Sequence, residues 1–319
     1  MAAIPDVVSR RLPRPPFPYS APTFPGGVEV PEPPPRSGPD YDTDWARRYP
    51  ARLARAALVE TLGRGLVTAL ARPRVAGLDR LDVLDGRANG AGGRDRAAGP
   101  VIFAANHHSH VDTPVLLTAI PDMWRHRLFV GGAADYFFRT RITSALSALC
   151  IGAIPIERTR VSRRSADRAA HLIDAGWSML IFPEGGRSPD GWGQPFLGGA
   201  AYLGLRCGVP VVPVHLLGTG RILRKGSRRP RPAAVTVTFG TPILPQVGTN
   251  ARRLSAAIER AVEALADEAT TDWWSARRRA HAGTSPALTG PRAAAWRRAW
   301  ALGDRDAKRR RQRRSWPQV

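Results

Sequence analysis

Short apolar runs alternate with amphipathic segments through the middle of the chain, and this alternation limits the possible folds more than any other feature. Six runs have the length of strands, at residues 100–106, 127–133, 152–157, 178–184, 209–218 and 234–240. Helical patterns fit between them and after them, near residues 111–120, 140–150, 161–176, 197–207 and 250–268. Continuous apolar runs are typical of strands that are buried on both faces. We therefore predict an α/β fold whose largely parallel or mixed sheet is covered by helices on both faces.

The two ends of the chain differ in composition from its middle. Residues 1–40 hold 12 of the 30 prolines, a density that prevents regular secondary structure, so we predict a proline-rich disordered leader over residues 1–43. Residues 44–272 are expected to form the main domain, and an amphipathic, arginine-rich helix is predicted over 44–71. The remaining residues, 273–319, are predicted to form a basic tail rich in tryptophan and arginine.

The chain is strongly basic, with 48 Lys and Arg against 26 Asp and Glu and a formal net charge of +22. The tail 273–319 contains 13 basic and two acidic residues, so it contributes half of this excess. Tryptophans interleaved with arginines suit an anionic membrane surface, and they also suit nucleic acid. A solvated tail without a specific partner is the third interpretation. Apolar runs are too short for spanning helices, so we do not expect a polytopic membrane protein.

A polar cluster, Asn106 to Asp112, directly follows the first apolar run. In α/β sheets, residues just past the carboxyl end of a strand are where sites tend to form. The imidazole of His107 has the right intrinsic pKa to take a proton from a hydroxyl near neutral pH. Asp112, at the start of the next helix, is spaced to orient the other ring nitrogen. Such a pair would activate a hydroxyl that a substrate supplies.

Three histidines within four residues also raise the idea of a metal site. No HExxH pattern, no cysteine pair and no second carboxylate cluster accompanies them, and Cys150 and Cys207 lack the spacing of metal ligands. We therefore predict no metal. For this stretch taken alone, histidines with a purely structural role are an equal alternative.

Two later segments also end apolar runs with charged groups. Gly152 to Arg158 ends in an arginine, which is suited to binding phosphate through two hydrogen bonds. Phe182 to Ser188 brings together an acid, two glycines and an arginine, and glycines let backbone N–H groups approach an anion closely. Each segment alone is weak evidence, because an arginine after a strand is usually a surface residue.

In their order and spacing, these segments resemble the four sequence blocks of the glycerolipid acyltransferases. The first block of that family, NHxSxxD, is matched by Asn106, His107, Ser109 and Asp112. The second block is matched by Gly152 to Arg158, the third by FPEGGRS at 182–188 in place of FPEGTRS, and the fourth by the apolar run around Pro213. The resemblance covers roughly residues 75–245.

The resemblance implies a glycerol-3-phosphate acyltransferase-like fold and the transfer of an acyl group to a lysophospholipid hydroxyl in phospholipid biosynthesis. The acceptor of first choice is 1-acyl-glycerol 3-phosphate, the donor is acyl-CoA or acyl carrier protein, and no further cofactor is expected. The resemblance makes His107 the catalytic base and Asp112 its partner. It assigns acceptor binding and supporting roles to further residues, namely Arg158, Glu184, Gly185 and Arg187 for binding, and Asn106 and Ser109 for support. A lipid acceptor also implies a cytoplasmic protein that is peripheral on the inner face of the cell membrane.

Other functions remain open at this point. Within the family, the acceptor could be glycerol 3-phosphate or another lysolipid, and Gly186 in place of the usual threonine bears on that choice. A catalytically inactive lipid-binding relative is a further alternative. A basic nucleic-acid-binding protein is the rival class, although residues 1–272 carry 35 basic and 24 acidic residues without a recognisable nucleic-acid motif.

Overall fold

The computed structural model describes residues 37–84, 99–157, 163–188, 191–223, 229–246 and 248–290. These residues all belong to the compact unit that begins at Pro35. Most of the predicted leader, up to residue 36, and the predicted tail from residue 291 onward lie outside the described residues.

A mixed sheet forms the centre of the fold. Its strands lie in the order β1-β7-β6-β2-β5-β3-β4, and neighbouring strands are parallel except for β6 and β7. Each of the six predicted apolar runs contains one strand, which confirms the predicted fold class. The strands are β1 (Arg74–Ala76), β2 (Ile102–Ala105), β3 (Leu128–Ala133), β4 (Ala153–Ile156), β5 (Ser178–Ile181), β6 (Val211–Leu217) and β7 (Thr236–Phe239). The short, exposed β1 was not predicted, because its three residues form no apolar run.

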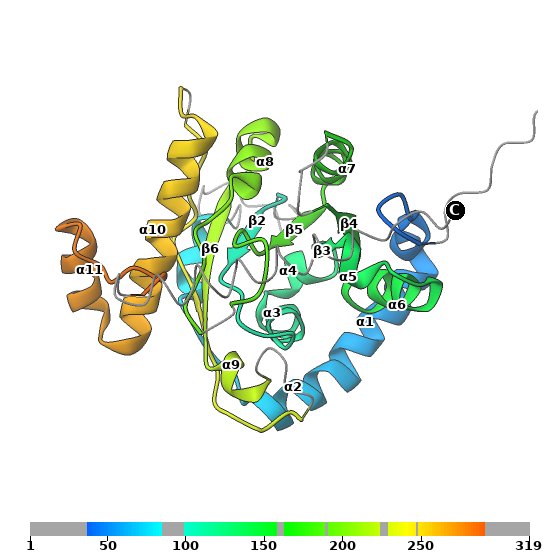
Figure 1. Cartoon of the computed structure of the whole chain (residues 1–319), viewed down its shortest axis with the longest axis horizontal. Helices are drawn as coiled ribbons and strands as arrows, with labels where there is room; N and C mark the ends of the chain where they lie inside the picture. Colours follow the sequence, from blue (N-terminus) through cyan, green and yellow to red (C-terminus); the bar gives the residue numbers. More distant parts are fainter. Residues whose placement is uncertain are drawn as a thin grey trace, which may run out of the picture. The chain divides into compact units, whose positions relative to one another are not determined.

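Helices cover both faces of the sheet (Figure 1). Alternate residues of β2 point to opposite sides, so Phe103 belongs to one buried cluster and Ile102 to the other. The first face is covered by α1 (Tyr49–Leu58), η2 (Val59–Gly63), α2 (Arg64–Ala71), α3 (Asp112–Ala119), α4 (Asp122–Arg125) and α6 (Arg141–Ile151). The second is covered by α7 (Arg163–Asp174), α8 (Gly199–Cys207) and α10 (Ala251–Thr270). Shorter elements connect these, namely η1 (Asp44–Arg47), η3 (Leu78–Leu84), α5 (Ala134–Phe137) and α9 (Thr219–Ile222).

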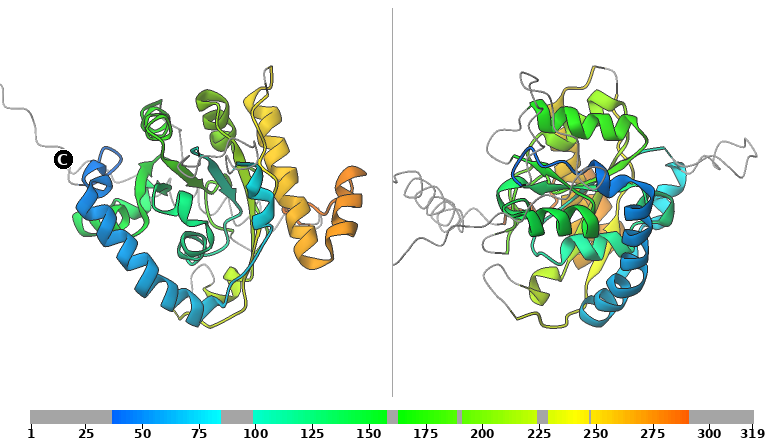
Figure 2. Two further views of the ribbon diagram at one scale, coloured as in Figure 1. Left: turned by 180° about the vertical axis from the view of Figure 1, so that it is seen from behind. Right: turned by 90° about the vertical axis from the view of Figure 1, so that its right-hand side faces the viewer.

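The segment predicted as an arginine-rich helix forms one helical rod of α1, η2 and α2 along the flank of the unit (Figure 2). Pro50 lies in the first turn of α1, where its missing N–H costs no hydrogen bond. Val59 and Val67 face the core. Other positions of the rod expose large apolar side chains, each 55–75% accessible: Tyr49, Leu53, Leu62 and Leu66.

The structure continues past residue 272, where we expected the tail to begin. Trp273–His281 form α11, which packs against α10. Arg279 donates from Nε to Oδ2 of the buried Asp267 at 2.6 Å and from Nη2 to its Oδ1 at 2.8 Å. The start of the predicted tail is therefore a structured part of this unit. Among the described residues, no helix combines the length and apolarity needed to cross a membrane.

Candidate active site

The polar segments singled out in the sequence meet at one edge of the sheet. Strands β2, β5 and β6 are parallel to one another, so their carboxyl ends lie together. The Asn106 to Asp112 turn follows β2, the Phe182 to Ser188 loop follows β5, and α9 follows β6. This edge therefore brings together side chains that are more than a hundred residues apart in the chain.

His107 and Asp112 form a hydrogen-bonded pair. The Nδ1 atom of His107 lies 2.8 Å from Oδ2 of Asp112, which is the first residue of α3 and is fully buried. The same Oδ2 accepts the backbone N–H groups of His108 at 2.7 Å and Ser109 at 2.8 Å. A carboxylate oxygen only accepts hydrogen bonds, so Nδ1 carries a proton, and in the neutral imidazole Nε2 holds the lone pair. The side chain of His107 is 18% accessible, which leaves this ring open to a substrate.

The loop after β5 holds the ring and the backbone of His107. The imidazole stacks on the ring of Phe182, with the ring centroids 4.1 Å apart and the planes 20° apart. The N–H of His107 donates to Oε1 of Glu184 at 2.8 Å, and its carbonyl accepts the N–H of Ser188 at 2.9 Å. His107, which follows β2, is therefore held in place by the loop after β5 as well as by Asp112.

Glu184, predicted to bind the acceptor, forms hydrogen bonds with the backbone through both carboxyl oxygens. It is buried, and its second oxygen, Oε2, accepts the N–H of Gln194 at 2.8 Å. Both oxygens thus bind backbone groups of the protein. The pKa of Glu184 is raised to about 7 overall: burial raises it most, the negative charges of Asp112 and Glu259 also raise it, and the two backbone hydrogen bonds partly oppose the rise.

Gln194 is a site residue that the sequence did not reveal. Its Nε2 donates to the carbonyl oxygens of Gly186 at 3.1 Å and Arg187 at 3.3 Å, so it closes the loop after β5. Gly185 has a φ of +67°, and a Cβ there would lie 2.8 Å from Leu197 Cδ1. The loop therefore requires glycine at this position.

The structure describes one of the two arginines predicted to bind the acceptor. Arg187 follows Glu184 in the loop at the same edge as His107, and it is half-buried. Arg158 lies outside the described residues. The segment that leads to it, β4, ends at Ile156.

Asn106 and Ser109, predicted as supporting residues, bind the backbone of elements that follow β2 in the chain. The side chain of Asn106 forms two hydrogen bonds with the backbone of Leu216, accepting from its N–H at 2.7 Å and donating to its carbonyl at 2.9 Å. Ser109 donates from Oγ to the carbonyl of Leu223 at 2.9 Å and accepts the N–H of Val111 at 3.2 Å. These bonds anchor the turn to β6 and α9.

Other histidines lie close to the pair. His110 stacks on Tyr136, and its Nε2 lies 3.0 Å from the tyrosine hydroxyl. His215 on β6 is buried; burial, with a smaller effect of the charge on His108, lowers its pKa to about 3, so it is neutral near pH 7. No group of three His, Cys, Asp or Glu side chains with metal-binding geometry occurs in the described part of the chain.

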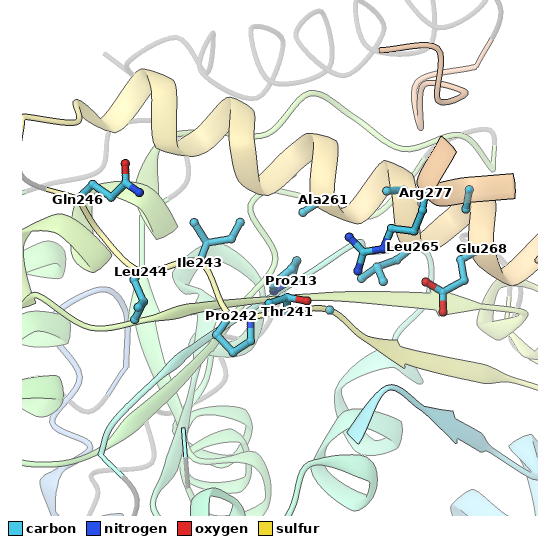
Figure 3. A pocket seen from close by; sticks show the side chains of 13 residues that line it. Pro213, Thr241, Pro242, Ile243, Leu244, Gln246, Ala261, Leu265, Glu268 and Arg277 are labelled. Atoms are coloured by element: carbon cyan, nitrogen blue, oxygen red, sulfur yellow. The ribbon is translucent and has the colours of Figure 1, made fainter. Parts of the chain in front are cut away.

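A cavity of about 470 Å³ lies at a different place, between α10, α11 and the segment after β7 (Figure 3). Pro242 and Ile243 line it, and Ile243 pairs with Val211 at the beginning of β6. The cavity is therefore at the amino end of β6, whereas the His107–Asp112 pair is beyond the carboxyl end of β2. We do not assign it to the same site.

Comparison with known proteins gives consistent matches. Residues 83–217 match the family model described as Acyltransferase. The chain is 34% identical over 130 residues to 1-acyl-sn-glycerol-3-phosphate acyltransferase BAT2, chloroplastic, of Brassica napus, which is 40% of this chain and 36% of that protein. It is 31% identical over 168 residues to a 1-acyl-sn-glycerol-3-phosphate acyltransferase of Chlamydomonas reinhardtii, which is 51% of this chain and 47% of that protein. The chain thus spans less than half the length of these two relatives.

A solved structure has a similar fold. The 1-acyl-sn-glycerophosphate acyltransferase PlsC from Thermotoga maritima superposes with a TM-score of 0.54 at 23% identity. The match covers 73% of this chain and 84% of that one. This similarity supports the α/β fold that the sequence predicted.

The raised pKa of Glu184 makes stability depend on pH. Its folded-state pKa of about 7 lies above the ordinary 4.5, so the unfolded chain binds fewer protons between these values and the free energy of unfolding falls as pH rises from 4.5 to 7. Glu184→Gln lacks this titration. In urea unfolding at pH 5 and pH 8, the wild type should lose more stability than the variant, by roughly 2 kcal/mol. Equal pH dependence in the two proteins would contradict the buried position of this carboxyl.

Proposed function

We propose that this chain, whose residues 83–217 match the acyltransferase family model, is a member of that family and transfers a fatty acyl group from a thioester to the hydroxyl of a lysophospholipid. The expected acceptor is 1-acyl-glycerol 3-phosphate, the substrate in the names of the relatives above. The observation that carries the proposal is the His107–Asp112 pair, in which Nδ1 binds the carboxylate and Nε2 has no hydrogen-bond partner among the described residues. We propose acyl-CoA or acyl carrier protein as the donor.

The geometry supports a direct transfer. Nε2 of His107 takes the proton of the acceptor hydroxyl while the hydroxyl oxygen attacks the carbonyl carbon of the thioester. The charge of Asp112 stabilises the imidazolium that forms. As the tetrahedral intermediate breaks its C–S bond, the imidazolium returns the proton to the departing sulfur. The products are the acylated lipid and a free thiol.

Acceptor binding is proposed for the loop after β5 together with Arg158. The phosphate of the acceptor would bind the guanidinium of Arg187 and that of Arg158, because arginine pairs with phosphate oxygens through two hydrogen bonds. Gly185 leaves room for the loop backbone to approach the acceptor. Glu184 acts through His107, since its oxygens bind backbone N–H groups.

Removal of either member of the pair should abolish most of the transfer. His107→Ala loses the base, and Asp112→Asn keeps an acceptor oxygen but loses the charge that stabilises the imidazolium. We expect kcat/KM for acyl transfer to fall by about 10²–10⁴-fold in both variants. The assay uses labelled acyl-CoA, or acyl carrier protein, with a panel of phosphorylated and unphosphorylated lysolipids.

His108→Ala and His110→Ala are the controls, and their effects should be milder. If His108→Ala were as damaging as His107→Ala, His107 would not be the base. Full activity of His107→Ala would overturn the proposed function and favour a lipid-binding role without catalysis.

Arg187→Ala should weaken acceptor binding more than donor binding. We expect a rise of about tenfold or more in the KM for a phosphorylated lysolipid, because a charge-assisted hydrogen bond to phosphate is lost. The KM for the acyl donor should stay close to that of the wild type. An unchanged dependence on the acceptor concentration would remove Arg187 from the acceptor site.

We also propose that the chain works as a peripheral protein on an anionic membrane surface, on the inner face of the cell membrane. Its acceptor and product are lipids. The exposed surface of the α1–α2 rod includes Tyr49, Leu53, Leu62 and Leu66, with arginines between them in the sequence. Such a combination suits a helix that lies in the lipid headgroup region.

Exposed leucines of the rod should contribute to membrane binding. In flotation with vesicles that contain phosphatidylglycerol, Leu62→Ser with Leu66→Ser should reduce the bound fraction, because less apolar area enters the lipid. Leu244→Ser is the control, since this leucine is 61% exposed on another part of the surface. Flotation that is equal for all three proteins would exclude the rod as the membrane contact.

A further inference from the structure

Arg55 on α1 is buried, with 5% of its surface accessible. Its Nη1 and Nη2 atoms have no hydrogen-bond partner among the described residues. Burial, with the positive charges of Arg52 and Arg47, lowers the pKa of Arg55 to about 10, so the side chain is still charged at neutral pH. A buried charge without a partner is unfavourable, which makes this side chain an anomaly in the fold.

Arg52 adds a second cation at the same place. Its Nε is also buried without a hydrogen-bond partner. The guanidinium carbons of Arg52 and Arg55 lie 5.4 Å and 5.9 Å from the ring centroid of Trp177. Arg47, close by, is paired with Asp44. Two like charges therefore face one indole ring, and neither is paired with a carboxylate among the described residues.

The cluster lies at the amino edge of the sheet. Trp177 directly precedes β5, and Gly152 directly precedes β4. Gly152 has a φ of +64°, and a Cβ there would collide with Nη1 of Arg55, so the glycine makes room for the guanidinium. His107 and Phe182, by contrast, lie just beyond the carboxyl ends of β2 and β5. Figure 1 shows α1 beside α6, on the same side of the sheet.

The end of α6 stabilises the charge of Arg55 only in part. Gly152 is the C-cap of this helix, and a helix C-terminus carries partial negative charge. No carbonyl of the described chain, however, accepts a hydrogen bond from Nη1 or Nη2 of Arg55. Both atoms therefore keep their hydrogen-bonding capacity, although they are buried.

We propose that Arg52 and Arg55 bind an oxyanion of the phosphate type, beside Trp177, at the amino edge of the sheet. The oxygens of this anion accept hydrogen bonds from Nη1 and Nη2 of Arg55 and from Nε of Arg52, the arrangement in which guanidinium groups bind phosphate. Arg52 and Trp177 are only half-buried, so the anion enters on their side, and these side chains have to move for it to reach the buried donors. The site is separate from the catalytic edge and goes beyond the proposed function.

Phosphate oxygens could come from two sources. Inorganic phosphate is one, and the headgroup of an anionic phospholipid is the other. Tyr49 and Leu53 on the same helix are 75% and 58% exposed, which would place a lipid phosphate next to α1. The chemistry of the site is the same in both cases, so the experiment has one arm for each source.

The first arm measures thermal unfolding of the full chain in inorganic phosphate and in chloride at equal ionic strength. The proteins are the wild type, Arg55→Met, Arg52→Met and Arg48→Met. Arg48 is the matched control, because it is an exposed arginine at the beginning of the same helix. With phosphate at about ten times its Kd, the wild type and Arg48→Met should gain roughly 3 °C in Tm, and the other two variants should gain nothing.

The second arm measures binding to vesicles of phosphatidylglycerol and phosphatidylcholine in a phosphate-free buffer. All three variants lose one positive charge, so general attraction to the membrane falls equally. If the lipid headgroup is the ligand, Arg55→Met should bind about fivefold more weakly than Arg48→Met. His107→Ala should keep both responses, which separates this site from catalysis.

Selective loss in either arm supports the site and identifies the source of the phosphate. Arg55→Met replaces a buried cation by an apolar side chain of similar length, and such exchanges are usually tolerated. Arg52→Met provides an independent variant should Arg55→Met fail to fold. The proposal is overturned if the folded variants at positions 52 and 55 respond like Arg48→Met in both arms.

Discussion

One carboxylate oxygen, Oδ2 of Asp112, organises the turn on which the candidate active site depends. It accepts three hydrogen bonds, from Nδ1 of His107 and from the N–H groups of His108 and Ser109. The same residue begins α3, where a negative charge also interacts favourably with the helix dipole. The carboxylate therefore shapes the backbone of the turn, starts the next helix and orients the imidazole. A substitution there affects all three together.

Glu184 performs a similar task between two strands. Its oxygens connect the N–H of His107, after β2, with the N–H of Gln194, beyond the loop that follows β5. The cost is a buried carboxyl with a raised pKa. The relative position of the imidazole and of Arg187 thus depends on a residue that need not touch the substrate. Within this short loop, Glu184 thus positions the imidazole, and Arg187 is left to bind the acceptor.

The strands of the sheet and the His107–Asp112 pair could be predicted from the sequence, because short stretches of residues determine both. Apolar runs identify strands that are buried on both faces, and the five-residue spacing of His107 and Asp112 is spanned by one turn. The sequence did not reveal the role of Gln194 or the hydrogen bonds of Glu184. The partners of both side chains are backbone groups, and these come together only in the folded loop. Helix α11 was missed because its tryptophans and arginines resemble a solvated tail; the contact between Arg279 and Asp267 decides its position.

Strand β5 is only four residues long, from Ser178 to Ile181, with Trp177 directly before it and Phe182 directly after it. One of these rings faces two arginines and the other supports the imidazole of His107. Five steps along a strand span roughly 17 Å, longer than any single phosphate group. A phosphate at one end of β5 therefore cannot displace the phosphate of an acceptor at the other end. If a phosphate bound beside Trp177 affects the acceptor site, the effect has to pass through the protein. In kinetic measurements, this phosphate would then not compete with the acceptor.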